Sequence, residues 1–197
     1  MITILDYGAG NLRSVQNTLG EIGAEYELVR DAAGLNTATK IILPGVGHFG
    51  QMMRALDQMQ VREALLGRIR AGVPFLGICL GLQALFETSE EAPLERGLGL
   101  FPGEIRRFPA TARVPHMGWN EIEPRNGAKL LKNLAPQPYL YFAHSYYAPL
   151  TEATAASCHY IQPYSAVLER GNVHAVQFHP EKSGPVGLRV VRNFLEF

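Results

Sequence analysis

Apolar positions in the first half of the chain follow two different spacings. Short, nearly continuous apolar runs predict buried strands at residues 1–6, 26–29, 40–44 and 73–78. Apolar residues three or four positions apart predict helices at residues 11–22, 49–71 (with a break near 58–60) and 80–86. Continuous apolar strands that alternate with helices are typical of a parallel sheet covered on both faces.

The pattern changes after residue 87, where glycine, proline and short strand-like pieces become frequent. Strand-like runs at residues 138–149, 153–161, 165–170 and 173–178 are joined by connections too short for crossover helices, so part of the sheet should be antiparallel. Residues 185–197 predict a final helix. We therefore expect one α/β domain over residues 1–197, with three layers and a mixed, mainly parallel sheet.

Composition narrows the possible partners and compartments. Lys plus Arg and Asp plus Glu number 18 each, so net charge gives no reason to expect nucleic acid or an anionic membrane as a partner. No apolar run reaches the roughly 20 residues that a membrane span needs, and the N-terminus has no signal-peptide pattern. Two cysteines do not make a disulfide framework, which indicates reduced thiols and a cytoplasmic protein.

Cys79 stands between Gly77 and Gly81, where a predicted strand gives way to a predicted helix. This G-x-C-x-G spacing is typical of a nucleophile elbow, a tight turn that lifts one side chain above the sheet edge. A helix N-terminus beside the sulfur would favour the thiolate. A buried structural cysteine is the alternative interpretation, and Cys158, in an alternating strand-like run, is expected to be one.

His179 and Glu181 are candidates for the base that a nucleophilic cysteine needs and for the group that orients it. Pro180 favours an extended conformation at His179, in which both side chains would point to the same side. A surface loop with an accidental H-x-E is the alternative. The other histidines have no carboxylate at short spacing and the cysteines form no C-x-x-C, so no metal site is expected.

The segment LPGVGHFG at residues 43–50 follows a predicted buried strand. Its glycines would let backbone N–H groups approach a ligand and donate to an oxyanion. A simple strand–helix turn explains the same residues equally well.

The strings PGVG, GICLGLQ and HPEKS, in this order, resemble the class I (triad) glutamine amidotransferases. More narrowly, DYGAGNLRSV, PGVGHFG, MGWN, FAHSYY and VQFHPEKSG resemble the glutaminase subunit of imidazole glycerol phosphate synthase, of histidine biosynthesis. The resemblance spans nearly the whole chain. It implies a flavodoxin-like fold, no cofactor, and hydrolysis of L-glutamine.

The resemblance also implies a triad of Cys79, His179 and Glu181 that works through a thioester. The thiol would attack the side-chain amide carbon, the imidazole would pass the proton to the departing ammonia, and the carboxylate would hold the imidazole. Water would then release glutamate. The oxyanion would meet backbone N–H groups of Leu80 and of the segment Gly45, Val46 and Gly47.

Substrate contacts are implied at Gln83, Glu91, Ser145 and Tyr146. Glu91 would meet the α-amino group, although its polar loop suits a solvated acid equally well.

The implied partner is a cyclase subunit, a (β/α)8 barrel that forms a heterodimer with this chain and receives its ammonia. The cyclase would make imidazole glycerol phosphate and an aminoimidazole carboxamide ribonucleotide. Contacts with it are implied at Asn11, Trp119, Asn120, Tyr141 and Lys182. A lone tryptophan such as Trp119 also suits a core position, but large aromatic side chains concentrate at interfaces.

Three other functions fit part of the pattern. A glutaminase subunit of pyridoxal phosphate synthesis would not be expected to contain MGWN and HPEKSG. A stand-alone γ-glutamyl hydrolase would turn over without a partner. A thiol sensor or chaperone of similar topology would not need His179 and Glu181 beside Cys79.

Overall fold

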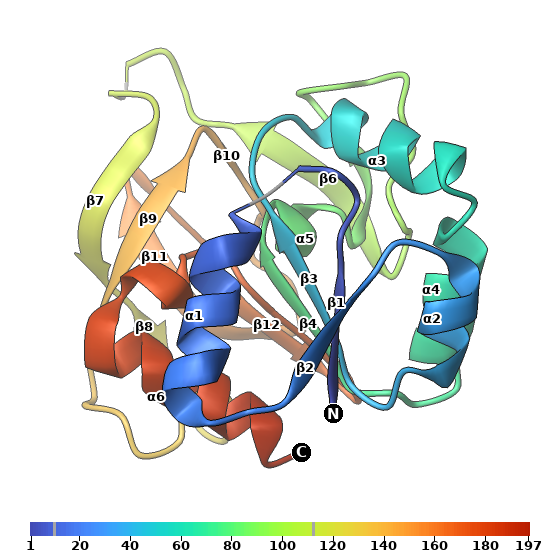
Figure 1. Ribbon diagram of the computed structural model, residues 1–197. Helices are drawn as coiled ribbons and strands as arrows, with labels where there is room; N and C mark the ends of the chain where they lie inside the picture. The colour runs from blue at the N-terminus through green and yellow to red at the C-terminus, as the bar shows by residue number, and fades with distance from the viewer. Residues whose placement is uncertain (10, 112) are drawn as a thin grey trace.

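An eight-stranded mixed sheet runs through the centre of the fold, with helices on both faces (Figure 1). The computed structural model describes residues 1–9, 11–111 and 113–197. The strand order is β2-β1-β3-β4-β13-β12-β11-β8. The predicted α/β architecture with a mainly parallel, mixed sheet is confirmed.

Parallel strands form the first part of this sheet. These strands are β1 (Ile2–Leu5), β2 (Tyr26–Val29), β3 (Ile41–Gly45), β4 (Phe75–Cys79) and β13 (Val173–Val176). Their continuous apolar sequences are explained by burial on both faces. In β3, for example, Ile42 packs into the core on one face of the sheet and Leu43 into the core on the other.

Helices cover the two faces unequally (Figure 1). One face carries α1 (Leu12–Ile22) and α6 (Gly184–Leu195). The other face carries α2 (Ala32–Thr37), α3 (Phe49–Gln58) and α4 (Arg62–Arg70). No helix of the described residues is long and apolar enough to cross a membrane.

The remaining strands are antiparallel or form small separate sheets. The central sheet is completed by β12 (Gln162–Arg170), β11 (Thr154–Tyr160) and β8 (Glu123–Pro124), all antiparallel to their neighbours. A three-stranded sheet contains β10 (Tyr146–Tyr147), β6 (Phe101–Arg107) and β5 (Phe86–Ser89). An antiparallel ribbon consists of β7 (His116–Glu121) and β9 (Tyr139–His144). The sequence indicated antiparallel pairing here but did not separate the three sheets.

Of two helix predictions, the structure confirms one and shortens the other. The predicted break near residues 58–60 is confirmed, because α3 ends at Gln58 and α4 begins at Arg62. The helix predicted over 80–86 is too long: α5 (Leu80–Gln83) is a single turn. The chain leaves the helix after Ala84 because its carbonyl accepts from the Leu98 N–H and Phe86 begins a strand.

The carboxyl ends of β3, β4 and β13 lie side by side in the sheet. The chain continues from these ends into the Gly45–Gly47 segment, into Cys79 and into the segment that leads to His179. Open α/β sheets bind ligands at this edge. The fold therefore brings together three motifs that are up to 134 residues apart in the sequence, from Gly45 to His179.

Candidate active site

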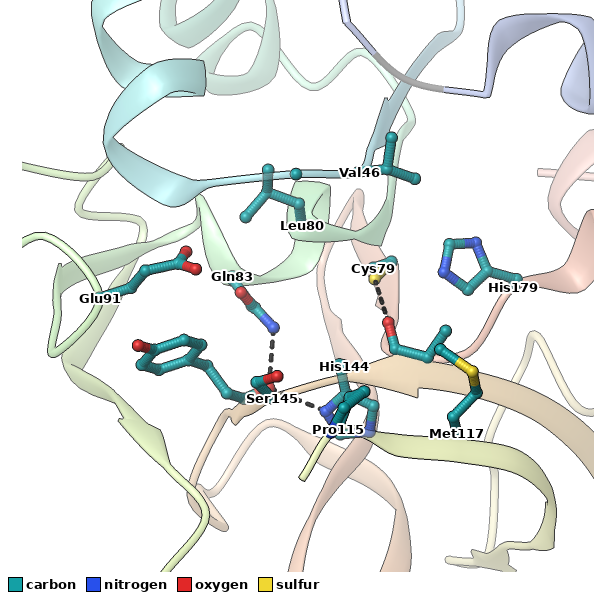
Figure 2. A pocket seen from close by; sticks show the side chains of 13 residues that line it. Val46, Cys79, Leu80, Gln83, Glu91, Pro115, Met117, His144, Ser145 and His179 are labelled. Atoms are coloured by element: carbon teal, nitrogen blue, oxygen red, sulfur yellow. Dashed lines mark hydrogen bonds between the residues drawn. The ribbon is translucent and has the colours of Figure 1, made fainter. Parts of the chain in front are cut away.

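A cavity of about 190 Å³ lies at this edge of the sheet (Figure 2). Nine of the predicted site residues line it: Val46, Gly47, Cys79, Leu80, Gln83, Glu91, Ser145, Tyr146 and His179. Four lining residues were not predicted: Pro115, Met117, Ala143 and His144. The cavity is small and polar groups converge on it, which suits a ligand the size of an amino acid.

At Cys79, the last residue of β4, the chain turns sharply into α5. Its backbone has φ 54° and ψ −104°, a strained conformation for a residue with a side chain. The strain is held by close packing at the flanking glycines. A Cβ on Gly77 would meet the carbonyl of Gly81, and a Cβ on Gly81 would meet the carbonyl of Leu43. The predicted elbow is confirmed, and its glycines are required mainly by this close packing.

The thiol of Cys79 is almost buried, with 6% of the residue exposed. Its Sγ lies 4.0 Å from the carbonyl oxygen of Ala143, to which the thiol points (Figure 2). The side-chain amide of Gln177 donates to the same sulfur at 3.6 Å. The helix that follows Cys79 is one turn long, so the contribution of its dipole to the thiolate is smaller than a longer helix would give.

His179 and Glu181 form a buried pair beside the cavity. The imidazole Nδ1 lies 2.8 Å from the Glu181 carboxylate, and each side chain is 3% exposed. His179 is extended as predicted, with φ −99° and ψ 96°. Glu181 is not extended, because it belongs to the 3-10 helix η1 (Pro180–Lys182). The two side chains meet through this tight turn, which the Ser183 hydroxyl holds by donating to the His179 carbonyl at 2.7 Å.

The surroundings of His179 favour its charged form. Burial alone would lower the pKa of this imidazole, but the hydrogen bonds and negative charges of Cys79 and Glu181 raise it above its usual value. Figure 2 shows the imidazole beside the sulfur, although the thiol itself is directed at Ala143. In enzymes without substrate, such contacts are often poorly aligned. The arrangement favours the imidazolium form of His179 beside the Cys79 sulfur.

The Gly45–Gly47 segment passes directly over the elbow. Gly45 is the register partner of Cys79 across β3 and β4, and a Cβ on Gly45 would lie 2.7 Å from the Cβ of Leu80. Gly47 has φ +100°, a conformation that favours glycine. Val46 lines the cavity described above and also a second cavity of about 180 Å³. The two cavities therefore meet at this segment.

Tyr7 lies in the second cavity, behind Val46. The residue is 5% exposed, and its hydroxyl forms no hydrogen bond with any residue that the structure describes. Burial raises the pKa of Tyr7, and a backbone group of Val46 acts against this rise. A backbone group of Val46 therefore lies close to the Tyr7 hydroxyl.

Two of the predicted substrate-binding side chains have defined partners. Gln83 Nε2 donates to the Tyr146 carbonyl at 2.9 Å and to Gln177 Oε1 at 3.1 Å. Glu91 Oε2 accepts from the backbone N–H of Phe49, the first residue of α3, at 2.7 Å. Glu91 is half-buried, is held by this hydrogen bond and lines the cavity, which favours the substrate-binding interpretation over a solvated loop.

The predicted partner residues gather around the β7–β9 ribbon. Trp119 is 56% exposed, so its interpretation as a core residue is wrong. It pairs in register with Tyr141, with the two ring centroids 6.1 Å apart, and Lys182 Nζ lies 5.8 Å from the Tyr141 ring centroid. Asn120 Nδ2 donates to the His159 carbonyl at 3.1 Å. Asn11 stands separately at the start of α1 and gives that helix no side-chain cap.

The sequence profile of the family Glutamine amidotransferase class-I matches residues 3–196. The chain belongs to the class I glutamine amidotransferases. Two solved structures show the same fold: a crystal structure of a glutamine amidotransferase (TM-score 0.78, 22% identity, 99% of this chain and 97% of that one) and PurLQS from Thermotoga maritima (TM-score 0.76, 19% identity, 99% and 97%).

Curated relatives narrow the family further. Imidazole glycerol phosphate synthase subunit HisH of Methanothermobacter thermautotrophicus is 49% identical over 100% of this chain and 98% of the relative. The same subunit of Deinococcus radiodurans is 47% identical over 98% and 92%. The chloroplastic imidazole glycerol phosphate synthase hisHF of Arabidopsis thaliana is 44% identical over 99% of this chain and 34% of its own length. The resemblance to the glutaminase subunit is confirmed.

A buried polar cluster under this amidotransferase cavity was missed by the sequence analysis. His116 Nδ1, His144 Nε2 and Tyr164 Oη lie 3.2–3.3 Å from one another. His144 Nδ1 donates to the Tyr146 carbonyl at 2.8 Å. Burial lowers the pKa of His116 to about 4 and that of His144 to about 3, so both imidazoles are neutral. The register of the ribbon pairs His116 with His144, and this pairing is visible only in the structure.

Cys158 is a core residue of this amidotransferase, as predicted. It is 1% exposed, and burial raises the pKa of its thiol to about 11, which makes it a poor nucleophile. Among the described residues, no three His, Cys, Asp or Glu side chains gather as metal ligands.

Proposed function

We propose that this chain is the glutaminase subunit of an imidazole glycerol phosphate synthase, with Cys79 as nucleophile, His179 as base and Glu181 as the group that orients it. The observation that carries this proposal is the arrangement at the elbow. A strained cysteine and His179 line the same cavity, Glu181 is paired with His179 beside it, and the surroundings of His179 favour its charged form. The HisH relatives support the role in histidine biosynthesis.

The reaction would proceed in two halves. The Cys79 thiolate forms a bond to the side-chain amide carbon of glutamine, and the carbonyl electron pair moves onto oxygen. When this tetrahedral species collapses, the C–N bond breaks and His179 gives its proton to the leaving nitrogen, which departs as ammonia. Water, deprotonated by His179, then attacks the thioester carbon. The thiolate leaves, and glutamate is released.

Two backbone groups would meet the oxyanion: the N–H of Leu80 and the N–H of Val46. In the resting state that we propose, the Val46 N–H is turned away from the cavity toward the side where Val46 and Tyr7 line the second cavity. Loss of one such donor costs about 10²–10³ in rate. Gly47 lowers the steric barrier to turning this peptide. The isolated chain would therefore hydrolyse glutamine slowly, and a partner that binds the turned state more tightly would activate it.

Glutamine would lie between Cys79 and Glu91, at opposite ends of the cavity (Figure 2). The Glu91 carboxylate would bind the α-amino group, since it is the acidic side chain that lines the cavity among the described residues. Gln83, Ser145 and Tyr146 would hold the remainder of the substrate. Both N–H groups of the Gln83 amide donate to protein acceptors, so its Oε1 is the atom that can accept a hydrogen bond from the substrate.

The partner would be a cyclase subunit that binds the exposed face of Trp119, Tyr141 and Lys182, together with Asn11 and Asn120, to form a heterodimer. Large aromatic side chains with a nearby cation are typical of interface anchors. Ammonia released into water at neutral pH would become ammonium, so a closed passage to the cyclase serves the chemistry. The need for a reduced thiol suits a cytoplasmic complex.

The test is a pair of assays on the complex of this chain with its cyclase. Cys79→Ala is expected to abolish synthesis from glutamine and to leave synthesis from an ammonium salt at alkaline pH unchanged, because the cyclase needs only ammonia. Cys158→Ser, which replaces a buried thiol outside the cavity, is the matched control and should retain both activities. Equal loss of both activities in Cys79→Ala would contradict the proposed role.

A further inference from the structure

The side chain of Gln177 contacts the sulfur of Cys79 from beneath the cavity. Gln177 follows β13 and precedes His179 by two residues, and it is fully buried. Its Nε2 lies 3.6 Å from Sγ, a normal distance for an N–H donor to sulfur. The reaction described above gives this amide no role.

The hydrogen bonds around Gln177 determine which end of its amide faces the sulfur. The carbonyl of Tyr146 can only accept, so Gln83 must direct its NH₂ group toward that oxygen, at 2.9 Å. The same NH₂ group has a second hydrogen, which goes to Gln177 Oε1 at 3.1 Å. Because the oxygen of Gln177 is held by Gln83, its NH₂ group must face Cys79.

Two polar groups approach Sγ, and they favour different protonation states. The Ala143 carbonyl, at 4.0 Å, is an acceptor and can interact only with the S–H of the neutral thiol. The Gln177 amide is a donor, and a donor is bound more strongly by a thiolate than by a thiol. The amide is also neutral and does not titrate, so it can stabilise the thiolate without competing with His179 for the proton.

We infer that Gln177 is a further catalytic residue of the glutaminase, which stabilises the Cys79 thiolate through its Nε2–H, and that Gln83 and the Tyr146 carbonyl fix its orientation. This inference rests on the proposed function, because it assigns a role in the same nucleophilic step. It adds to the triad a neutral donor from the same strand end that carries the base.

The reactivity of Cys79 toward iodoacetamide tests this inference without any need for turnover. The background should be Cys158→Ser, so that Cys79 is the thiol that is alkylated. Gln177→Leu removes the donor at similar volume and is expected to slow alkylation at pH 7 about ten- to hundredfold, the value of a hydrogen bond to a charged group. With glutamine and the cyclase, kcat should fall to a similar extent while KM changes little.

A second variant separates the electronic role from a structural one. Gln177→Glu keeps an oxygen for the Gln83 amide but places an acceptor, charged when ionised, against the sulfur. It should move the midpoint of the alkylation rate to higher pH by more than Gln177→Leu does. Asn193→Leu removes another buried amide, which donates to the Leu130 and Lys132 carbonyls away from the cavity, and should leave the alkylation profile unchanged.

Alkylation profiles of Gln177→Leu and Gln177→Glu that coincide with the parent protein would overturn the inference. Synthesis from ammonium by the same complexes reports whether each variant folds and binds the cyclase. If one variant fails to fold, the other still decides the question. Failure of the proposed function is a separate outcome: the parent protein would then alkylate normally but release no glutamate in the presence of the cyclase.

Discussion

Replacing His116 by phenylalanine is expected to make the fold less sensitive to acid between pH 7 and pH 5. His116 is 5% exposed and stacks on the ring of Tyr160 with centroids 4.0 Å apart. Phenylalanine preserves this stacking. The loss of the imidazole still leaves His144 Nε2 paired with the Tyr164 hydroxyl at 3.2 Å. The variant therefore removes one titrating group from the cluster with little change in packing.

The sign and size of the change in unfolding free energy with pH follow from the pKa of His116. Burial lowers it from 6.5 to about 4, so in this range the unfolded chain binds a proton that the folded chain does not. The stability that depends on the neutral imidazole is fully present above about pH 6.5 and is lost as the pH falls toward 4. Each pH unit within the window costs about 1.4 kcal/mol. At pH 5, the loss assigned to His116 is at most about 2 kcal/mol.

Urea unfolding at pH 7 and pH 5 measures this difference. The loss of unfolding free energy between the two pH values should be about 2 kcal/mol smaller in His116→Phe than in the parent protein. Other titrating groups, including His179, whose raised pKa acts in the opposite direction, cancel in the comparison. His159→Phe, at an exposed histidine, is the control and should lose as much as the parent. Equal losses in His116→Phe and the parent would refute the reasoning.

Three further changes probe the site and the partner surface. Glu181→Gln leaves a buried imidazolium without its charge partner, a cost of about 3–5 kcal/mol, so glutamate release with the cyclase should fall about 10²–10⁴-fold while synthesis from ammonium persists. Tyr7→Phe removes the hydroxyl beside the Val46 backbone, and glutamate release by the chain alone should rise by no more than about fivefold, because a neutral hydrogen bond sets the upper limit for such a contact. Trp119→Ala should weaken cyclase binding at least tenfold by calorimetry, and unchanged affinity would place the interface elsewhere.

Hydrophobic spacing predicted the parallel half of the fold well, because strands buried on both faces are apolar throughout. It failed at Leu80–Phe86, where a short apolar run suits a buried helix or a strand equally. Tertiary contacts determine the secondary structure there, because Phe86 pairs with Phe101, which lies 15 residues further along the chain. Helix α2 was missed because Leu35 is its one buried residue. Asp31 could have indicated the start of this helix, because it is the N-cap residue and its side chain accepts from the Gly34 N–H.

The candidate site could be predicted where its chemistry is local in the sequence. Cys79 stands between its glycines, and Glu181 is two residues from His179, so spacing alone indicated both. Gln177 and His144 could not be found in this way. Their roles depend on hydrogen bonds between segments 94 and 28 residues apart, from Gln83 to Gln177 and from His116 to His144, and a single sequence does not reveal such pairings.

Different groups stabilise the Cys79 thiolate and the oxyanion that forms during hydrolysis. On one side, buried groups that belong to the chain itself, His179 with Glu181 and the amide of Gln177, favour the thiolate. On the other side, in the proposed resting state, the Val46 N–H is turned away from the cavity, so the oxyanion would lack a donor. Alkylation by iodoacetamide needs the thiolate and develops no oxyanion, whereas glutamine hydrolysis needs both. A partner that only turns the Val46 peptide should therefore accelerate glutamine hydrolysis and leave the alkylation rate of Cys79 unchanged, provided that the docked cyclase leaves the cavity open to the reagent.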